Sequence, residues 1–140
     1  SLRFVVALPE INIETRFARS VLPEAIPLKD AIRNWANTAA LAAAVARGTG
    51  AEIGRAVEDH VIEPVRSRLI PGFADVKRAA IEAGAYGCSI SGAGPAVFAV
   101  ATPDAADKVA VAMHAAFQRH GLSSRHYISA PDNRGARRLD

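Results

Sequence analysis

The chain has 140 residues, of which half are apolar, and a formal net charge of +3. This length allows one domain to bury a core of its own without disulfides or a structural metal, and no apolar run approaches the roughly 20 residues needed to cross a bilayer. We therefore expect no membrane span and no secretion signal, and the single cysteine, Cys88, excludes an internal disulfide and favours a cytoplasmic location.

The first half of the chain is predicted to hold one strand and three helices, with boundaries set by prolines and glycines. Proline cannot donate to a sheet ladder and disfavours helix in the residue before it, but it fits the first turn of a helix. A glycine directly after a helix commonly ends it, because glycine adopts the left-handed conformation found there. The predicted elements are a strand over 2–8, a short helix over 16–22 with Thr15 as its cap, a long helix from Pro27 to about Ala46, and a helix over 51–60.

The second half is predicted to hold three further strands and two helices. An irregular segment over 61–70 is closed by Pro71 and Gly72. Val109, Met113 and Phe117 recur at helical spacing, which indicates an amphipathic helix between Pro103 and Gly121. The other expected elements are a helix over 73–83, strands over 86–91 and 96–102, a strand over 125–130, and a possible short strand near 135–139.

Without the additional helices, this order is strand, helix, strand, strand, helix, strand. Such an order is typical of the α+β, ferredoxin-like split β-α-β fold, an antiparallel sheet covered by helices on one face. We expect residues 1–140 to form one such domain with extra helices inserted. Because the chain begins at Ser1 and enters a strand at once, we also expect it to be a piece of a longer protein.

A glycine-rich hairpin tip is the strongest local signal. The strand over 86–91 and the strand over 96–102 are joined by Ser91-Gly92-Ala93-Gly94-Pro95, which carries almost no side chains. Glycine permits positive φ and lets a ligand or another backbone approach closely. From the residues alone, this segment is equally well explained as an ordinary tight turn or as part of a binding site.

The hairpin resembles the C-terminal motif of the GHMP kinases, and Gly92, Gly94 and Pro95 match that motif. Ala93 and Ala96 stand where many homoserine kinases have Ser and Thr, which puts side-chain hydrogen bonds there in doubt but leaves the backbone shape unaffected. Two more stretches resemble homoserine kinases in particular: the segment over 9–23, and Glu63-Pro64-Val65-Arg66 with the Leu69-Ile70-Pro71-Gly72-Phe73 that follows. The resemblance covers about residues 4–139.

The resemblance implies a substrate pocket for L-homoserine lined by Thr15, Arg19 and Arg66, with Ser91 to Pro95 bordering the active site. Local chemistry agrees, since residues four apart on a helix face the same way. A guanidinium donates two parallel hydrogen bonds to a carboxylate. Glu63, three residues before Arg66, is expected to orient it. No metal-ligating residues are expected, because the four histidines lack metal-ligand spacing.

The resemblance also implies that the catalytic machinery lies elsewhere. ATP and Mg²⁺ would be bound mainly by an N-terminal kinase half, so no catalytic residue is assigned in this chain. The intact protein, expected to be a homodimer, would transfer the γ-phosphate of ATP to the homoserine hydroxyl, a step of threonine biosynthesis. We expect this chain by itself to be inactive.

Three other functions stay open at this point. The chain is also compatible with another small-molecule GHMP kinase, with a ferredoxin-like regulatory module that binds an amino acid, and with an RNA-binding α+β domain. Few aromatic residues and no base-stacking motif argue against a nucleic-acid partner.

Overall fold

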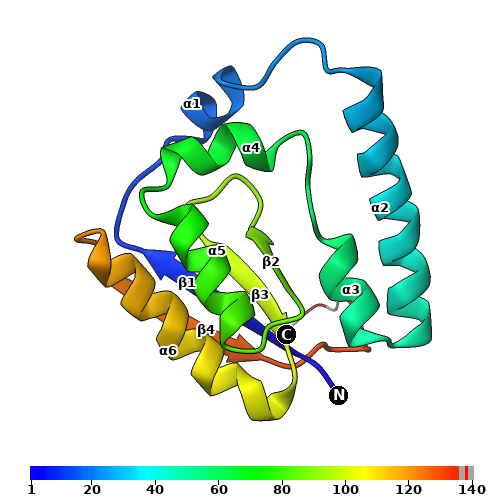
Figure 1. Ribbon diagram of the computed structural model, residues 1–140, viewed down its shortest axis with the longest axis vertical. Helices are drawn as coiled ribbons and strands as arrows, with labels where there is room; N and C mark the ends of the chain where they lie inside the picture. Colours follow the sequence, from blue (N-terminus) through cyan, green and yellow to red (C-terminus); the bar gives the residue numbers. More distant parts are fainter. Residues whose placement is uncertain (136–137, 139–140) are drawn as a thin grey trace.

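Four antiparallel strands form one sheet in the order β2-β3-β1-β4 (Figure 1). The computed structural model describes residues 1–135 and residue 138. Every neighbouring pair of strands is antiparallel. The two central strands are β3 and β1, and the edge strands are β2 and β4. This order is that of the split β-α-β fold, so the predicted fold class is confirmed. The strands are β1 (Arg3–Pro9), β2 (Gly87–Ile90), β3 (Val97–Ala101) and β4 (Ser124–Ser129).

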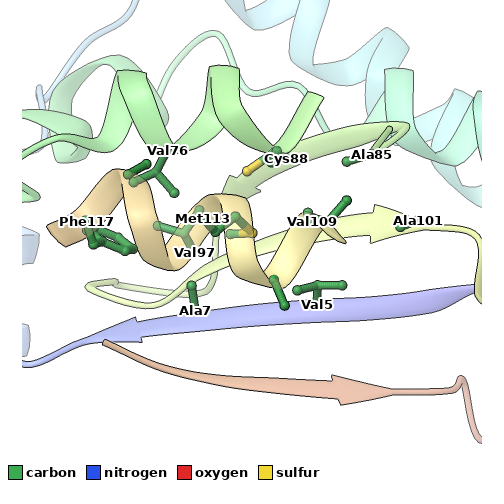
Figure 2. Close-up of a cluster of buried hydrophobic side chains, with 14 of the residues drawn as sticks. Val5, Ala7, Val76, Ala85, Cys88, Val97, Ala101, Val109, Met113 and Phe117 are labelled. Atoms are coloured by element: carbon green, nitrogen blue, oxygen red, sulfur yellow. The ribbon is translucent and has the colours of Figure 1, made fainter. Parts of the chain in front are cut away.

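Two helices, α5 (Phe73–Glu82) and α6 (Pro103–Arg119), cover one face of the sheet. Figure 2 shows Met113 and Phe117 of α6 between the strands and Val76 of α5. All three side chains are fully buried. Most of the buried apolar residues in the described part of the chain belong to this layer, which therefore contributes most to hydrophobic stabilisation.

The opposite face of the sheet holds a second, smaller apolar cluster. Successive side chains of a strand point to opposite faces, so Val100 lies on the other side from its neighbours Ala99 and Ala101. Ala44 of α2 (Leu28–Arg47) and Ile53 of α3 (Gly50–Ala56) pack against Val100. The inserted helices therefore extend the predicted fold by partly covering the second face.

Most predicted boundaries are confirmed for the expected physical reasons. Helix α2 begins after Pro27 and ends at Gly48, whose φ of 70° is the left-handed conformation that glycine adopts easily. Helix α6 begins after Thr102, whose side chain accepts a hydrogen bond from the backbone of Ala105. These signals lie within a few residues of the boundary that they set.

Three local predictions were wrong. Thr15 is the first residue of α1 (Thr15–Ser20) and does not cap it; the cap position belongs to Glu14. The helix expected over 51–60 ends at Ala56. The segment over 61–70 is not irregular, because it forms the helical turn α4 (Glu63–Arg66) and the 3₁₀ turn η1 (Ser67–Leu69).

The early end of α3 has a physical cause in the next turn of the chain. The backbone N–H of His60 donates to the side-chain oxygen of Asn34 on α2, 2.8 Å away, instead of to a carbonyl of α3. The carboxylate of Asp59 accepts from the N–H groups that open α4. Residues 59 and 60 thus form hydrogen bonds with α2 and with the start of α4, and α3 does not continue through them.

No helix among residues 1–135 and 138 is both long enough and apolar enough to cross a membrane. The possible short strand near 135–139 lies mostly outside the described residues.

Candidate functional site

The glycine-rich loop between β2 and β3 is an open tip built from backbone. Gly92 and Gly94 have φ values of 59° and 80°, a region that favours glycine. The N–H of Gly94 donates to the carbonyl of Ser91, and the N–H of Ser91 donates to the carbonyl of Ala96, at 3.0 and 2.8 Å. Ser91 and Gly92 are exposed. The loop therefore presents backbone groups of fixed direction to the surface.

Arg66 connects this loop to helix α1. Its Nε donates to the carbonyl oxygen of Ala18 at 3.1 Å, and its Nη1 donates to the carbonyl oxygen of Gly92 at 3.1 Å. Ala18 belongs to the last turn of α1, where carbonyls have no helical partner. The guanidinium is thereby fixed in place, and it keeps further N–H donors for an anion.

Helix α1 brings the two other predicted substrate residues to the same region. Thr15 and Arg19 are both exposed, and their spacing of one helical turn places them on one side of α1. Arg19 follows Ala18, the residue whose carbonyl Arg66 binds. The structure thus gathers α1, Arg66 and the glycine-rich loop into one region.

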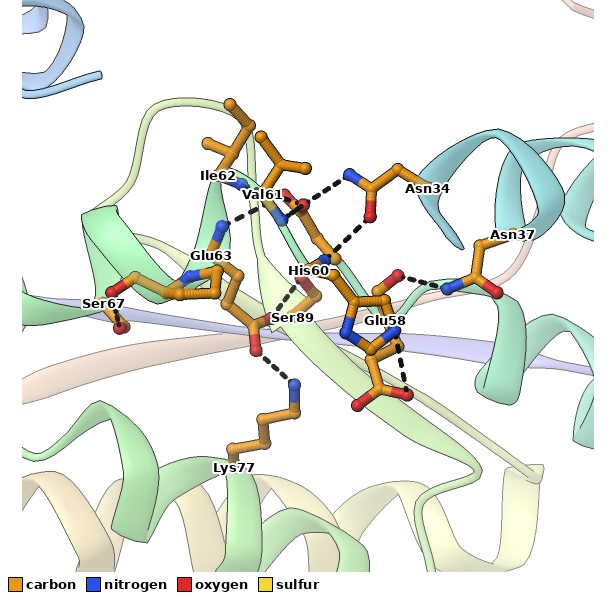
Figure 3. A network of polar contacts seen from close by, with 12 residues as sticks. Asn34, Asn37, Glu58, His60, Val61, Ile62, Glu63, Ser67, Lys77 and Ser89 are labelled. Atoms are coloured by element: carbon orange, nitrogen blue, oxygen red, sulfur yellow. Dashed lines mark hydrogen bonds and ion pairs between the residues drawn. The ribbon is translucent and has the colours of Figure 1, made fainter. Parts of the chain in front are cut away.

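The expected contact between Glu63 and Arg66 is replaced by other partners. Figure 3 shows the Glu63 carboxylate pointing to Ser89 of β2 and Lys77 of α5. Arg66 is oriented by the carbonyls of Ala18 and Gly92. Glu63 therefore holds the α4 turn that carries Arg66, rather than the guanidinium itself.

Asp59 fixes the start of the same turn. Its carboxylate accepts from the N–H groups of Val61, Ile62 and Glu63 at 2.8 to 3.1 Å, and from the side-chain amide of Asn34 at 2.8 Å. Burial raises the pKa of Asp59, but these hydrogen bonds together outweigh burial and leave the pKa below its ordinary value. The ionised carboxylate thus ties α4 to helix α2.

A hollow of about 400 Å³ lies beside α1 and is lined by Asn12, Ile13, Glu14, Phe17 and Leu69. It offers a carboxylate and an amide next to the helix that carries Thr15 and Arg19. A cavity of about 800 Å³ lies elsewhere, among apolar side chains that include Phe4, Leu41 and Phe98. The polar residues that line the smaller hollow are Asn12 and Glu14, and its lining does not include Thr15, Arg19 or Arg66.

The described residues provide no obvious metal centre and no reactive thiol. No group of three or more His, Cys, Asp and Glu side chains is placed to hold a metal ion within residues 1–135 and 138. Cys88 is 2% exposed, and burial raises the pKa of its thiol to about 12. This thiol is a packing group of the core.

Sequence reasoning missed several residues that build the site. Lys77, Ser89 and Asn34 lie 14 to 26 positions from their partners Glu63 and His60. No spacing rule connects residues so far apart. The need of Glu63 for a partner follows from its burial, which only the structure shows.

Comparison with known proteins identifies relatives of this chain. The family described as GHMP kinases C terminal matches residues 41–119. A homoserine kinase of Chlorobium phaeobacteroides is 47% identical over 134 residues, which are 94% of this chain and 42% of the relative. A homoserine kinase of Pyrococcus furiosus is 43% identical over 127 residues, or 91% of this chain and 43% of the relative.

A solved structure agrees with these sequence relatives. The crystal structure of homoserine kinase from Cytophaga hutchinsonii superposes with a TM-score of 0.89 at 42% identity. The match covers 92% of this chain and 41% of that one. The chain thus spans about two fifths of the length of the relatives it matches.

Proposed function

Because the chain belongs to the GHMP kinases through their C-terminal family, we propose that it is the C-terminal domain of a homoserine kinase. The complete protein would transfer the γ-phosphate of ATP to the hydroxyl of L-homoserine. In this proposal residues 1–140 form one domain, and an N-terminal half provides the ATP-binding site. The high identity to homoserine kinases that are more than twice as long supports this division.

The observation that carries the proposal is the position of Arg66 between α1 and the glycine-rich loop. We assign to Arg66 and Arg19 the binding of the homoserine carboxylate, for which a guanidinium is the natural partner. Thr15 lines the same pocket. The backbone of Ser91 to Pro95 borders the cleft in which the hydroxyl meets the phosphate.

ATP and Mg²⁺ are assigned mainly to the N-terminal half. Phosphoryl transfer needs backbone amides around the phosphates and a divalent ion to offset their charge. The role of this chain is then to bind and orient the acceptor.

A homodimer in the cytoplasm is also part of the proposal. Leu28, Ile32 and Trp35 recur at helical spacing on α2, and each is more than half exposed. Such an apolar stripe favours association with a second copy or with the N-terminal half. The one cysteine is a free thiol, which suits a reducing compartment.

A kinase assay on the full-length protein that carries this chain tests the proposal. ADP release is measured with ATP and, in parallel, homoserine, mevalonate or galactose as acceptor. With ATP present, we expect the full-length protein to turn over homoserine but neither mevalonate nor galactose. We expect no turnover by residues 1–140 without the rest of the protein. Faster turnover with another acceptor, or activity of residues 1–140 alone, would contradict the proposal.

A further inference from the structure

Glu63, Lys77 and Ser89 form a buried polar cluster that substrate binding does not directly use. The Glu63 carboxylate pairs with the Lys77 ammonium and accepts from the Ser89 hydroxyl at 2.6 Å. Glu63 and Ser89 are 8% and 6% exposed, and the Lys77 side chain is 27% exposed. Lys77 also lies 5.9 Å from the centre of the Phe73 ring. A buried charge of this kind is costly unless its partners are held in place.

The cluster and Arg66 attach the same short turn to the same strand and loop. Helix α4 runs only from Glu63 to Arg66, so one residue at each end makes a long-range contact. Glu63 binds the side chain of Ser89 on β2, while Arg66 binds the carbonyl of Gly92, three residues later. Figure 3 shows the Glu63 carboxylate between Ser89 of β2 and Lys77 of α5.

A single helical turn has little stability of its own, because its nucleation is unfavourable. The position of α4 therefore depends on its anchors, which are Asp59 before the turn, Glu63 at its start and Arg66 at its end. Arg66 can reach both Ala18 and Gly92 only if the turn stays seated on β2. Without Glu63, the long-range side-chain hydrogen bonds of α4 to the rest of the described chain would be those of Arg66.

We propose that Glu63, Lys77 and Ser89 are positioning residues that seat α4, so that Arg66 is held in place to bind the carboxylate of the acceptor. This inference rests on the proposed function, since it assigns the affinity for homoserine to a cluster that does not touch it. Lys77 neutralises the carboxylate of Glu63. The hydrogen bond from Ser89 sets the distance between that carboxylate and β2. Binding of ATP is independent of the cluster.

The test uses Ser89→Ala and Lys77→Met in the full-length protein that carries this chain. Ser123→Ala and Lys108→Met are matched controls, because both side chains are exposed and lie away from the cluster, Ser123 in the loop before β4 and Lys108 on α6. We expect the cluster variants to raise KM for homoserine about tenfold with kcat and KM for ATP changed less than about twofold. Lys77→Arg, which keeps the charge, should recover most of the affinity.

A second measurement needs no substrate. The Nε–H resonance of Arg66, followed by NMR, reports the hydrogen bond to Ala18. In Ser89→Ala and Lys77→Met this resonance should shift, and the Nε proton should exchange faster with water. Both control variants should leave the resonance and the exchange rate unchanged. If Lys77→Met does not fold, Ser89→Ala decides the question, because it removes only one hydroxyl.

The two readouts separate the two proposals. Folded cluster variants that keep both the Arg66 resonance and KM at wild-type values would overturn the positioning role. An equal loss of kcat and of affinity for both substrates would also overturn it, because that pattern indicates general destabilisation. If wild type does not phosphorylate homoserine, the proposed function fails, and the Arg66 resonance still decides whether the cluster positions Arg66.

Discussion

The Nη1 atom of Arg66 lies 3.1 Å from the carbonyl oxygen of Gly92, although 26 residues separate them in the chain. The Nε atom of the same side chain binds the carbonyl of Ala18, 48 residues away. One guanidinium thus joins the end of a helix to the tip of a hairpin. Because it hydrogen-bonds both elements, Arg66 is the first target for mutation.

Replacement of Arg66 by lysine should weaken homoserine binding in the full-length protein. Lysine keeps the charge but cannot donate to both carbonyls and a carboxylate from one rigid plane. We expect KM for homoserine to rise about tenfold or more with KM for ATP nearly unchanged. Arg68→Lys is the control, since Arg68 is exposed two residues along. Equal effects of the two substitutions would exclude a specific role for Arg66.

Arg19 and Arg16 test whether charge or geometry matters on α1. Both are exposed on the same helix, but only Arg19 lies one turn from Thr15. We expect Arg19→Ala to lower kcat/KM for homoserine by about tenfold or more, and Arg16→Ala by less than about twofold. Similar losses in both variants would show that α1 attracts the substrate only through its net positive charge.

Asp59→Asn should destabilise the fold at neutral pH by about 1 kcal/mol, the typical net contribution of one hydrogen bond, because the amide has one acceptor oxygen fewer and no charge. The pKa of Asp59 is lowered in the folded protein, so its ionised form stabilises the fold above the ordinary value of 3.8. That contribution disappears as the pH falls through the lowered pKa. Urea unfolding should therefore show a difference from wild type at pH 7 that shrinks below about pH 4.

Asp107→Asn serves as the control for this series, because Asp107 is exposed on α6. A constant difference between wild type and Asp59→Asn over the whole pH range would show that the charge of Asp59 contributes nothing.

Gly54→Ala should destabilise the protein, although alanine is the better helix former. An added Cβ at Gly54 would overlap the backbone carbonyl of Tyr86, which leads into β2. Overpacking costs about 1–3 kcal/mol, which exceeds the gain of about 0.5–1 kcal/mol from helix propensity. Thermal unfolding gives the sign, with Arg55→Ala on the exposed side of α3 as the control. A stabilised Gly54→Ala variant would contradict the close packing of α3 on β2.

Cys88 should not react with thiol reagents in the folded protein. At pH 8 a thiol with a pKa of about 12 is ionised on the order of 1 part in 10,000, and its side chain is buried. We expect no labelling by Ellman's reagent under native conditions and one equivalent in urea. Rapid native labelling would show that β2 opens readily.

Much of the fold followed from signals that act within a few residues. The strand and helix order, the stops at Gly48 and Gly121, and the start of α6 at Pro103 depend on backbone preferences and on the periodicity of apolar side chains. The glycine-rich loop could be found from its residue types, whereas the candidate arginines followed from the resemblance to homoserine kinases.

The partners of these residues were decided by the tertiary structure. Asn34 and Asp59 end α3 early and turn residues 63–66 into a helix, and Glu63 binds Ser89 and Lys77 instead of Arg66. Propensity and periodicity describe neighbours up to about one helical turn away. Buried polar groups must find partners wherever the packed chain brings them, and that requirement is settled only when the distant elements meet.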